Sequence, residues 1–325
     1  MHARVTGLVF AIYYPIFAAI AVPANLVTIV ILSRGRCGLS RCITRYLVSM
    51  AVSDLLVVIT GVILNRIRGI YFPVSFLTTT PACSTIAVLT YAARNSSVWL
   101  TVAFTFDRCV AICYQKMKTK YCTEKTAANV IGTVCVLSCV KDIPSYFIYE
   151  PLYIMNNVPW FCSIKLIYYT SPGWAAYNWL DHIVTPCVPF VLIILLNVLT
   201  IRRILAVNRV RGRLRAHSNG DNPSDPEMES RRKSIILLLS ISGSFILLWI
   251  LYVINLLYVR FTNGKYFAGS NFTDPRFILQ EGGYMLQLLS CCTNTCIYAA
   301  TQSKFREEIK NAVKYPLTLI WKFIK

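Results

Sequence analysis

The stretch SIILLLSISGSFILLWILYVINLLYV, residues Ser234–Val259, contains no charged side chain. It exceeds the roughly 20 residues that a helix needs to cross a bilayer core about 30 Å thick. Lipid offers backbone groups no hydrogen-bond partners, so such a run must satisfy its own N–H and C=O groups within a helix. Residues 234–259 are therefore predicted to form one membrane-spanning helix.

Six more stretches have the same character. The further predicted spans are residues 8–32, 46–64, 82–106, 126–148, 175–201 and 277–301. Hydrophobic residues make up 56% of the 325-residue chain, as expected of a protein embedded in lipid. We therefore predict an all-α membrane protein, a bundle of seven transmembrane helices. Residues 1–325 should form a single domain, because the longest connection, 202–233, is too short for another one.

The charges indicate how the helices are oriented. Lys and Arg number 33 against 14 Asp and Glu, a net charge of +19. Such an excess suggests nucleic acid in a soluble protein, but here it concentrates in the connections 33–45, 107–125 and 202–233 and in the C-terminal tail. The positive-inside rule places these segments in the cytoplasm and the N-terminus outside. We expect a multi-pass plasma-membrane protein whose basic inner rim attracts anionic membrane lipids, with no nucleic-acid partner.

Two features concern the outer side and the N-terminus. Asn271-Phe272-Thr273 is an N-glycosylation sequon in the predicted outer connection between spans six and seven, so Asn271 is an expected glycosylation site. The first apolar run is too long for a cleaved signal peptide, and we expect it to act as an uncleaved anchor.

The cysteines predict one disulfide. Most of the 13 cysteines fall in spans or on the predicted inner face, where thiols stay reduced. Cys83, at the outer end of span three, and Cys162, in the next outer connection, are placed to pair. The alternative is two free thiols. His and Cys show no zinc-binding spacing, so no cofactor is expected apart from the sodium ion considered next.

Several polar residues lie at bilayer depth. A charge there costs about 2.5–3.5 kcal/mol on insertion scales, so it should face the bundle interior. Asp54 lies in the middle of span two and Asn25 in the middle of span one. With Ser97, Ser290 and Asn294 at similar depth, they can form a hydrated polar chamber. The oxygens of Asp54, Ser97, Ser290 and Asn294 would suit a sodium ion; interhelical hydrogen bonds without an ion are the alternative.

A charged pair ends span three. Asp107 and Arg108 are adjacent where lipid gives way to cytoplasm. Such a pair can be opened by protonation or by an inserted partner, which is the behaviour of a two-state switch. The alternative is an ordinary charged pair that stops membrane transfer.

In order along the chain, several motifs resemble those of the rhodopsin-like (class A) G-protein-coupled receptors. They are Pro23–Val27 with Asn25, Ala51–Leu56 with Asp54, Asp107–Cys109, Pro189 with Asn197, Phe245–Trp249, and Asn294–Tyr298. The resemblance implies an extracellular ligand and a heterotrimeric G protein as partners. It implies a short amphipathic eighth helix over about 303–323 on the inner membrane face. It also implies a coupling switch that consists of Asp107, Arg108, Asn197 and Tyr298.

Within this family the chain looks most like the branch named for probable G-protein-coupled receptor 139. The supporting segments are Ser97–Val102, Ile143–Tyr146 and Pro189–Asn197. That likeness implies an aromatic amino acid or a peptide as ligand and coupling to Gq. The amino-acid sensors of the branch carry an acid where this chain has Thr90 and an arginine where it has Tyr252, so their ligand does not simply transfer.

The chain also departs from the family pattern. Cys109 stands where the family carries a tyrosine after the arginine. Leu251 and Thr295 stand where it carries prolines. Proline kinks a helix by removing a backbone hydrogen bond, so spans six and seven should be straighter here. The balance between inactive and active states could then differ, which leaves open a receptor-like protein with weak or no G-protein coupling.

Charged and aromatic residues gather in the outer half of the predicted bundle. The residues expected to contact a ligand are Thr90, Arg94, Asp181, Trp249, Tyr252, Glu281 and Tyr284. Arg94 can fork onto a carboxylate, while Asp181 or Glu281 holds an ammonium. This set suits a small zwitterion with an aromatic side chain, or the end of a peptide. The alternative is that Arg94 and Asp181 bridge each other. Lys141-Asp142 is interpreted as a local pair at the interface.

Two other functional classes fit less well. A small transporter usually shows repeated halves and broken helices at the midplane, and the sequence shows neither. A membrane enzyme needs paired acids, a His-rich motif or a Ser/His dyad at one depth, and the sequence offers none. We therefore predict a receptor and not an enzyme.

Overall fold

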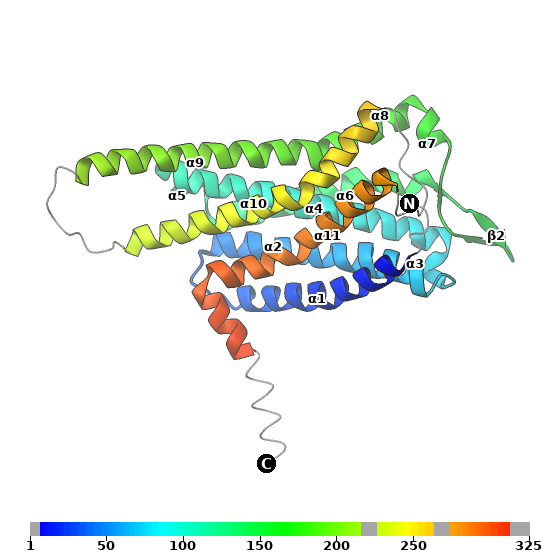
Figure 1. Cartoon of the computed structure of the whole chain (residues 1–325), viewed down its shortest axis with the longest axis horizontal. Helices are drawn as coiled ribbons and strands as arrows, with labels where there is room; N and C mark the ends of the chain where they lie inside the picture. The colour runs from blue at the N-terminus through cyan, green and yellow to red at the C-terminus, as the bar shows by residue number, and fades with distance from the viewer. Residues whose placement is uncertain (1–6, 216–225, 263–273, 313–325) are drawn as a thin grey trace, which may run out of the picture.

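A computed structural model describes residues 7–215, 226–262 and 274–312. Long helices of this described part lie side by side in an elongated bundle, with strand β2 at one end and the last turns of α9 at the other (Figure 1). The long helices are α1 (Leu8–Ser33), α2 (Arg41–Val57), α4 (Thr80–Cys113), α6 (Glu124–Asp142), α8 (Pro172–His182), α9 (Val188–Arg215), α10 (Pro226–Phe261) and α11 (Pro275–Thr301).

Shorter helical segments extend or join these helices. They are the π-helical η1 (Val58–Ile67) and η4 (Ile183–Cys187), the 3₁₀ turns η2 (Phe76–Thr78) and η3 (Ile143–Ile148), and the short helices α3 (Arg68–Tyr71), α5 (Gln115–Tyr121) and α7 (Ile167–Thr170). η1 continues α2, and η4 joins α8 to α9 into one long helical path. A π turn holds more residues than an α turn, so it changes the face that later residues present, and such turns are frequent at functional sites.

The described residues contain six helical segments that are long and apolar enough to cross a membrane. They are Leu8–Ser33, Arg41–Tyr71, Thr80–Cys113, Glu124–Ile148, Pro172–Val207 and Arg232–Phe261. The seventh helix, α11, is more polar because it carries Gln280, Glu281 and Gln287, all of which are buried. The predicted seven-helix bundle is thus confirmed. These polar side chains of α11 are buried against the neighbouring helices.

The helices are longer than the spans predicted from apolar runs. The second helical path covers Arg41–Tyr71 rather than 46–64. Apolar run length marks only the part expected in hydrocarbon, whereas capping residues set the helix ends. Ser40 is such a cap, because its Oγ accepts a hydrogen bond from the Ile43 N–H at 3.4 Å.

The connection after α6 forms two small antiparallel sheets at the end of the bundle. β1 (Tyr149–Glu150) pairs with β4 (Ser163–Ile164), and β2 (Tyr153–Met155) pairs with β3 (Val158–Trp160). The two residues between β2 and β3 are Asn156 and Asn157, with φ of 49° and 59°. Asparagine tolerates this left-handed conformation, which the tight turn of a two-residue hairpin requires.

The predicted disulfide is confirmed. Cys83 in the first turn of α4 is bonded to Cys162 in the connection that carries the small sheets, with their Cα atoms 6.3 Å apart. The bond ties this connection across the end of the bundle to the third span.

α10 and α11 pack closely against each other. Both continue as α-helix through Leu251 and Thr295, the positions at which the resembled family carries proline. At Gly283 of α11, a Cβ atom would lie 3.0 Å from the Tyr252 backbone nitrogen. Only glycine therefore allows the two backbones to approach this closely.

Two predictions reach beyond the described residues. Asn271 lies outside them, and so does the part of the predicted eighth helix after residue 312. The helical turns over 303–312 pack through Phe305, whose buried ring stands edge-on to Tyr298 with the ring centroids 5.8 Å apart.

Candidate functional site

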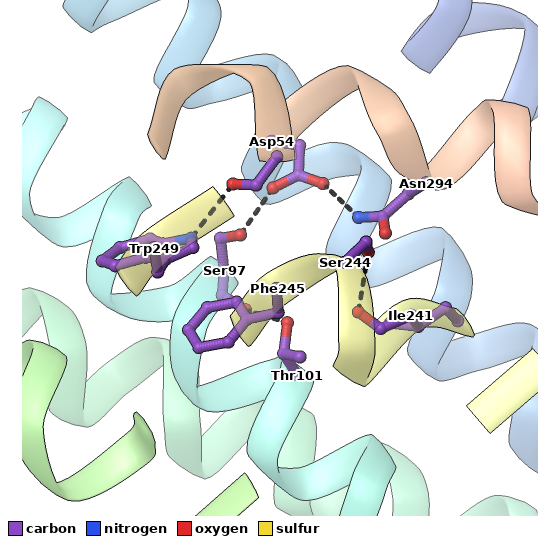
Figure 2. A pocket seen from close by; sticks show the side chains of 9 residues that line it. Asp54, Ser97, Thr101, Ile241, Ser244, Phe245, Trp249 and Asn294 are labelled. Carbon is purple, nitrogen blue, oxygen red and sulfur yellow. Dashed lines mark hydrogen bonds between the residues drawn. The ribbon is translucent and has the colours of Figure 1, made fainter. Parts of the chain in front are cut away.

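Asp54 lies near the end of α2, where it is 1% exposed and held by α4 and α11. Ser97 Oγ donates a hydrogen bond to Asp54 Oδ1 at 2.5 Å, and Asn294 Nδ2 donates to Oδ2 at 3.0 Å (Figure 2). Both donors are neutral, and among the described residues no cation pairs with this carboxylate. A single buried charge thus joins three helices that are distant in sequence.

A small cavity of about 10 Å³ adjoins the carboxylate. Its lining consists of Asp54, Ser97, Thr101, Ile241, Ser244, Phe245, Trp249, Ser290 and Asn294. This volume is close to the least that holds one water molecule. The cavity brings together all four residues predicted for a sodium site. An uncompensated carboxylate among hydroxyl and amide oxygens fits a small monovalent cation.

Ser290 has hydrogen-bond partners beyond the chamber, whereas Asn25 lies outside it. Ser290 Oγ accepts a hydrogen bond from Trp249 Nε1 at 3.1 Å and donates to the Gln287 carbonyl at 2.6 Å. Asn25 was expected in the same chamber, and that prediction was wrong. Its amide donates to the backbone carbonyl of Cys291 at 2.7 Å, because this face of α1 packs on α11. Asn25 therefore joins two helices and does not line the cavity.

Trp249 forms the boundary between this chamber and the outer half of the bundle. Its ring stacks on Phe245 with centroids 5.0 Å apart and meets Tyr252 edge-on at 5.7 Å. The indole is 2% exposed, so Tyr252 is the more accessible of the two predicted contact residues. Because Trp249 touches Tyr252 on one side and Ser290 on the other, a displacement of one can reach the other.

The predicted ion pair at the end of span three is present. Arg108 donates to Asp107 Oδ2 through Nε at 2.9 Å and through its terminal nitrogen, and both side chains are 7% exposed. Cys42 Sγ also contacts Asp107 Oδ1, at 3.4 Å. Removing one member of a buried pair leaves an uncompensated charge, so the arrangement resists opening unless another partner takes its place.

The other two predicted switch residues contact different elements. Asn197 Oδ1 accepts a hydrogen bond from Ser242 Oγ at 2.9 Å, which links α9 to α10. Tyr298 is fully buried beside Phe305, and its hydroxyl has no hydrogen-bond partner in the described structure. The structure therefore does not bring the four predicted switch residues into one contact network.

Arg94 lies on α4 in the outer half of the bundle. Its guanidinium stands over the Tyr91 ring, 5.3 Å from the centroid, and interacts electrostatically with Tyr252 and Asp181. Its Nε is buried without a hydrogen-bond partner, and no ion pair in the described residues joins Arg94 to Asp181. The bridge considered as an alternative is therefore absent. A buried donor without an acceptor is costly, so this group is suited to receive one.

Sequence reasoning missed the partner of Asp181. The ammonium of Lys141 contacts the Asp181 carboxylate, lies 3.0 Å from Asp142 Oδ1 and lies 3.3 Å from Thr185 Oγ1. Asn95 Nδ2 donates a hydrogen bond to the other Asp142 oxygen. The predicted local pair of Lys141 and Asp142 is therefore present, but Asp142 is 1% exposed and Lys141 also pairs with Asp181 on another helix. The available signal was the presence of opposite charges near the outer ends of spans four and five.

Glu281, the other predicted acid, is buried beside Arg66, with NH2 and Oε2 3.8 Å apart. Arg66 also stands over the Tyr284 ring, 4.7 Å from the centroid. Arg66 lies in the π-helical segment η1, and its side chain is 10% exposed. Thr90 is buried, and its hydroxyl donates to the Ile86 carbonyl at 2.7 Å. Thr90 is thus hydrogen-bonded to its own helix, whereas Glu281 Oε2 has no hydrogen-bond partner among the described residues.

The bundle has seven helices, an acidic chamber at its centre and an acid–base pair at the end of its third span. This is the architecture of a membrane receptor. The sequence matches the family described as 7 transmembrane receptor (rhodopsin family) over residues 24–298. Because the match covers most of the chain, the protein belongs to this family. It is a multi-pass membrane receptor and not an enzyme.

The chain is also similar to the FMRFamide receptor of Drosophila melanogaster. The two are 24% identical over 240 residues. The match covers 65% of this chain and 40% of that receptor, so it spans less than half the length of its relative.

Proposed function

We propose that this receptor binds an extracellular small molecule resembling an aromatic amino acid, or a short peptide, and activates a heterotrimeric G protein. The observation that carries this proposal is Arg94, a guanidinium in the outer half of the bundle whose Nε lacks an acceptor. A ligand carboxylate, from a free amino acid or from a peptide C-terminus, would supply that acceptor with a charge-assisted hydrogen bond.

The surroundings of Arg94 favour an aromatic ligand. Tyr91 and Tyr252 lie beside the guanidinium, and Trp249 packs against Tyr252. Aromatic rings prefer edge-to-face or offset contacts with one another, which such a wall provides. Tyr284, on α11, lies under the Arg66 guanidinium, 4.7 Å from its ring centroid, and is proposed to complete this aromatic lining.

The similar protein from Drosophila is named as a receptor for FMRFamide, by its name a peptide amide, which supports a peptide ligand but not the contact of a C-terminal carboxylate with Arg94. The likeness of motifs to the branch of probable G-protein-coupled receptor 139 supports an aromatic amino acid or a peptide equally and extends the proposal to Gq. The two forms differ in size, and a ligand series of increasing length separates them.

Signal transmission follows from the contacts of Trp249. A ligand that displaces Tyr252 moves the indole, and the indole is hydrogen-bonded to Ser290 beside the Asp54 chamber. Spans five and six then shift apart from span three, Arg108 leaves Asp107, and the opened groove admits the Gα subunit. The ligand drives this change only through its higher affinity for the active state.

The Asp54 chamber is proposed to hold a sodium ion in the inactive state. Asp54, Ser97, Ser290 and Asn294 would supply its oxygen ligands, and the ion would neutralise a carboxylate that otherwise has neutral partners. We further propose that the N-terminus is extracellular and the C-terminus cytoplasmic in the plasma membrane. The chain would then act as a single domain, glycosylated at Asn271, with a basic inner rim against anionic lipid.

The test is a ligand screen in cells that report all Gα classes, over aromatic amino acids and short peptides, each with a free or an amidated carboxylate. Arg94→Ala should lower the potency of carboxylate-bearing hits at least about tenfold and leave amidated hits unchanged. Arg260→Ala is the matched control: its Nε is also buried without a partner, but its NH2 already donates to Asn178 at 2.8 Å. If every hit kept its potency in Arg94→Ala, the carboxylate proposal would be wrong.

A second variant tests coupling itself. Replacement of Arg108 by Ala should abolish agonist-driven calcium or cyclic-nucleotide output, measured per receptor at the cell surface because loss of the buried pair also lowers stability. Output that is absent in the wild type for every agonist would favour the receptor-like protein with weak coupling. The substitutions at Cys109, Leu251 and Thr295 motivate that second candidate.

A further inference from the structure

A cluster of charged residues outside the Asp54 chamber joins spans three, four and five. Its centre is the Lys141 ammonium, which contacts both Asp142 and Asp181 and lies 3.3 Å from Thr185 Oγ1. Thr185 Oγ1 in turn donates to Asp181 at 3.1 Å. One cation therefore serves two carboxylates that come from different spans.

The two carboxylates differ in accessibility. The Asp142 side chain is 1% exposed, whereas the Asp181 side chain is 29% exposed. Asp142 also receives a hydrogen bond from Asn95, whose amide oxygen is buried and unpartnered within the described residues. Asp142 thus needs a cation at all times, because an unpaired charge at this depth is expensive. Asp181 is therefore the more accessible of the two carboxylates.

Lysine is suited to change partners at such a place. Its ammonium is a compact charge on a flexible four-carbon stem, so it can rotate toward one acid without leaving the other. In this cluster Lys141 can withdraw from Asp181 and stay paired with Asp142, which it already contacts at 3.0 Å. The withdrawal leaves no deeply buried charge unpaired, provided that another cation takes the place on Asp181.

A change at Asp181 would bear on span five. Asp181 lies in the last turn of α8, and Thr185 lies in the π-helical segment η4 that follows. The contacts of Lys141 therefore tie this segment to span four. Loss of these contacts frees the outer part of span five, on which the proposed opening of the bundle depends.

We propose that Lys141 is a tethered cation that fills an ammonium-binding site on Asp181 and that a ligand bearing a primary ammonium displaces it. This inference rests on the proposed function, since it names the group that would bind opposite the carboxylate held by Arg94. Lys141 is then a specificity-determining residue: it excludes weakly bound cations and admits a ligand whose carboxylate and ammonium are both recognised.

The test replaces the tethered cation by a free one. Full-length receptor in lipid nanodiscs is compared as wild type, Lys141→Ala and Lys141→Ala with Asp181→Asn. The probe is n-propylammonium, which matches the missing end of the lysine side chain, and n-propanol is the uncharged control. The thermal unfolding midpoint is followed as each compound is titrated.

We expect n-propylammonium, but not n-propanol, to raise the midpoint of Lys141→Ala. Its apparent affinity should be at least tenfold lower in the wild type, where it must compete with Lys141. The Asp181→Asn change should abolish the rescue. If Lys141→Ala does not fold, Lys141→Ala with Asp142→Asn replaces it, because this variant removes one charge of each sign and keeps Asp181.

Three results would overturn the proposal: no rescue by n-propylammonium in any folded variant, equal affinity in the wild type, or rescue that persists without Asp181. The measurement uses neither a natural ligand nor a G protein. A failed ligand screen would therefore count against the proposed function alone, and a failed rescue against the tethered cation alone.

Discussion

Asp54 and Asp142 are both 1% exposed, yet the bundle treats them in opposite ways. Asp142 has a cation from its own chain, the Lys141 ammonium, together with the Asn95 amide. Asp54 has Ser97 and Asn294, which are neutral, and a small cavity at its side. The difference teaches that a buried carboxylate paired with a cation of its own chain stabilises the fold. A buried carboxylate that has only neutral donors can instead bind an external ion.

The largest expected effect on stability is at the charged cluster around Lys141. Lys141→Ala should destabilise the receptor by about 3–5 kcal/mol, because it leaves the buried Asp142 without a cation. Unfolding in detergent micelles measures this loss. Lys141→Ala with Asp142→Asn should recover most of it, and a double variant as unstable as the single one would show that Lys141 acts through packing alone.

Sodium should stabilise the receptor by binding at the Asp54 chamber and not at the charged cluster around Lys141. At a sodium concentration tenfold above its Kd, the wild type should gain about 1.4 kcal/mol of stability by mass action. Asp54→Asn should abolish that gain, because the amide carries no charge to attract the ion. Thermal unfolding in sodium and in choline chloride at equal ionic strength measures it. A sodium effect that survives in Asp54→Asn would place the ion elsewhere.

The two asparagines offer a matched pair of smaller changes. Asn95→Ala and Asn294→Ala each remove one hydrogen bond to a buried carboxylate, which is worth about 1.5–3 kcal/mol. The two variants should therefore lose similar stability, but only Asn294→Ala should weaken the sodium response. Urea or thermal unfolding, repeated across a sodium titration, separates the two effects. Equal loss of the sodium response in both would contradict the distinction between the two sites.

The smallest loss of stability is expected at a hydrogen bond between uncharged side chains. It serves as the reference for the losses at the charged sites. Thr295 Oγ1 lies 2.8 Å from Thr28 Oγ1 and so joins α11 to α1 at a position where the family carries proline. Thr295→Val keeps the shape and removes the hydroxyl, at a cost of about 0.6 kcal/mol. Thr28→Val is the reciprocal control. A loss as large as that of Lys141→Ala would mean that neutral and charged contacts contribute alike.

Much of the inner site could be predicted from the sequence. Asp54, Ser97 and Asn294 were placed together because each lies at a similar depth in its own apolar run, and a charge in lipid must turn inward. Asp107 and Arg108 are adjacent, so their pair required no knowledge of packing. Cys83 and Cys162 followed from topology, since the outer side offered few other thiols.

The outer half resisted such reasoning. Lys141 and Asp181 are separated by 40 residues on two helices, and their contact depends on how each helix is rotated about its axis. Arg66 lies in η1 and Thr185 lies in η4, where π turns change the face that the following residues present. Apolar run length carries no information on either rotation.

The sequence by itself determined that this chain crosses a membrane as a helical bundle, because long apolar runs leave the backbone no other way to satisfy its hydrogen bonds in lipid. It also determined the family, through polar residues at fixed depths. Only the tertiary structure decided which buried charges are paired within the chain and which are left for a ligand or an ion. Pairing depends on distances between helices, and these are set by side-chain packing and by local π turns that no single span encodes.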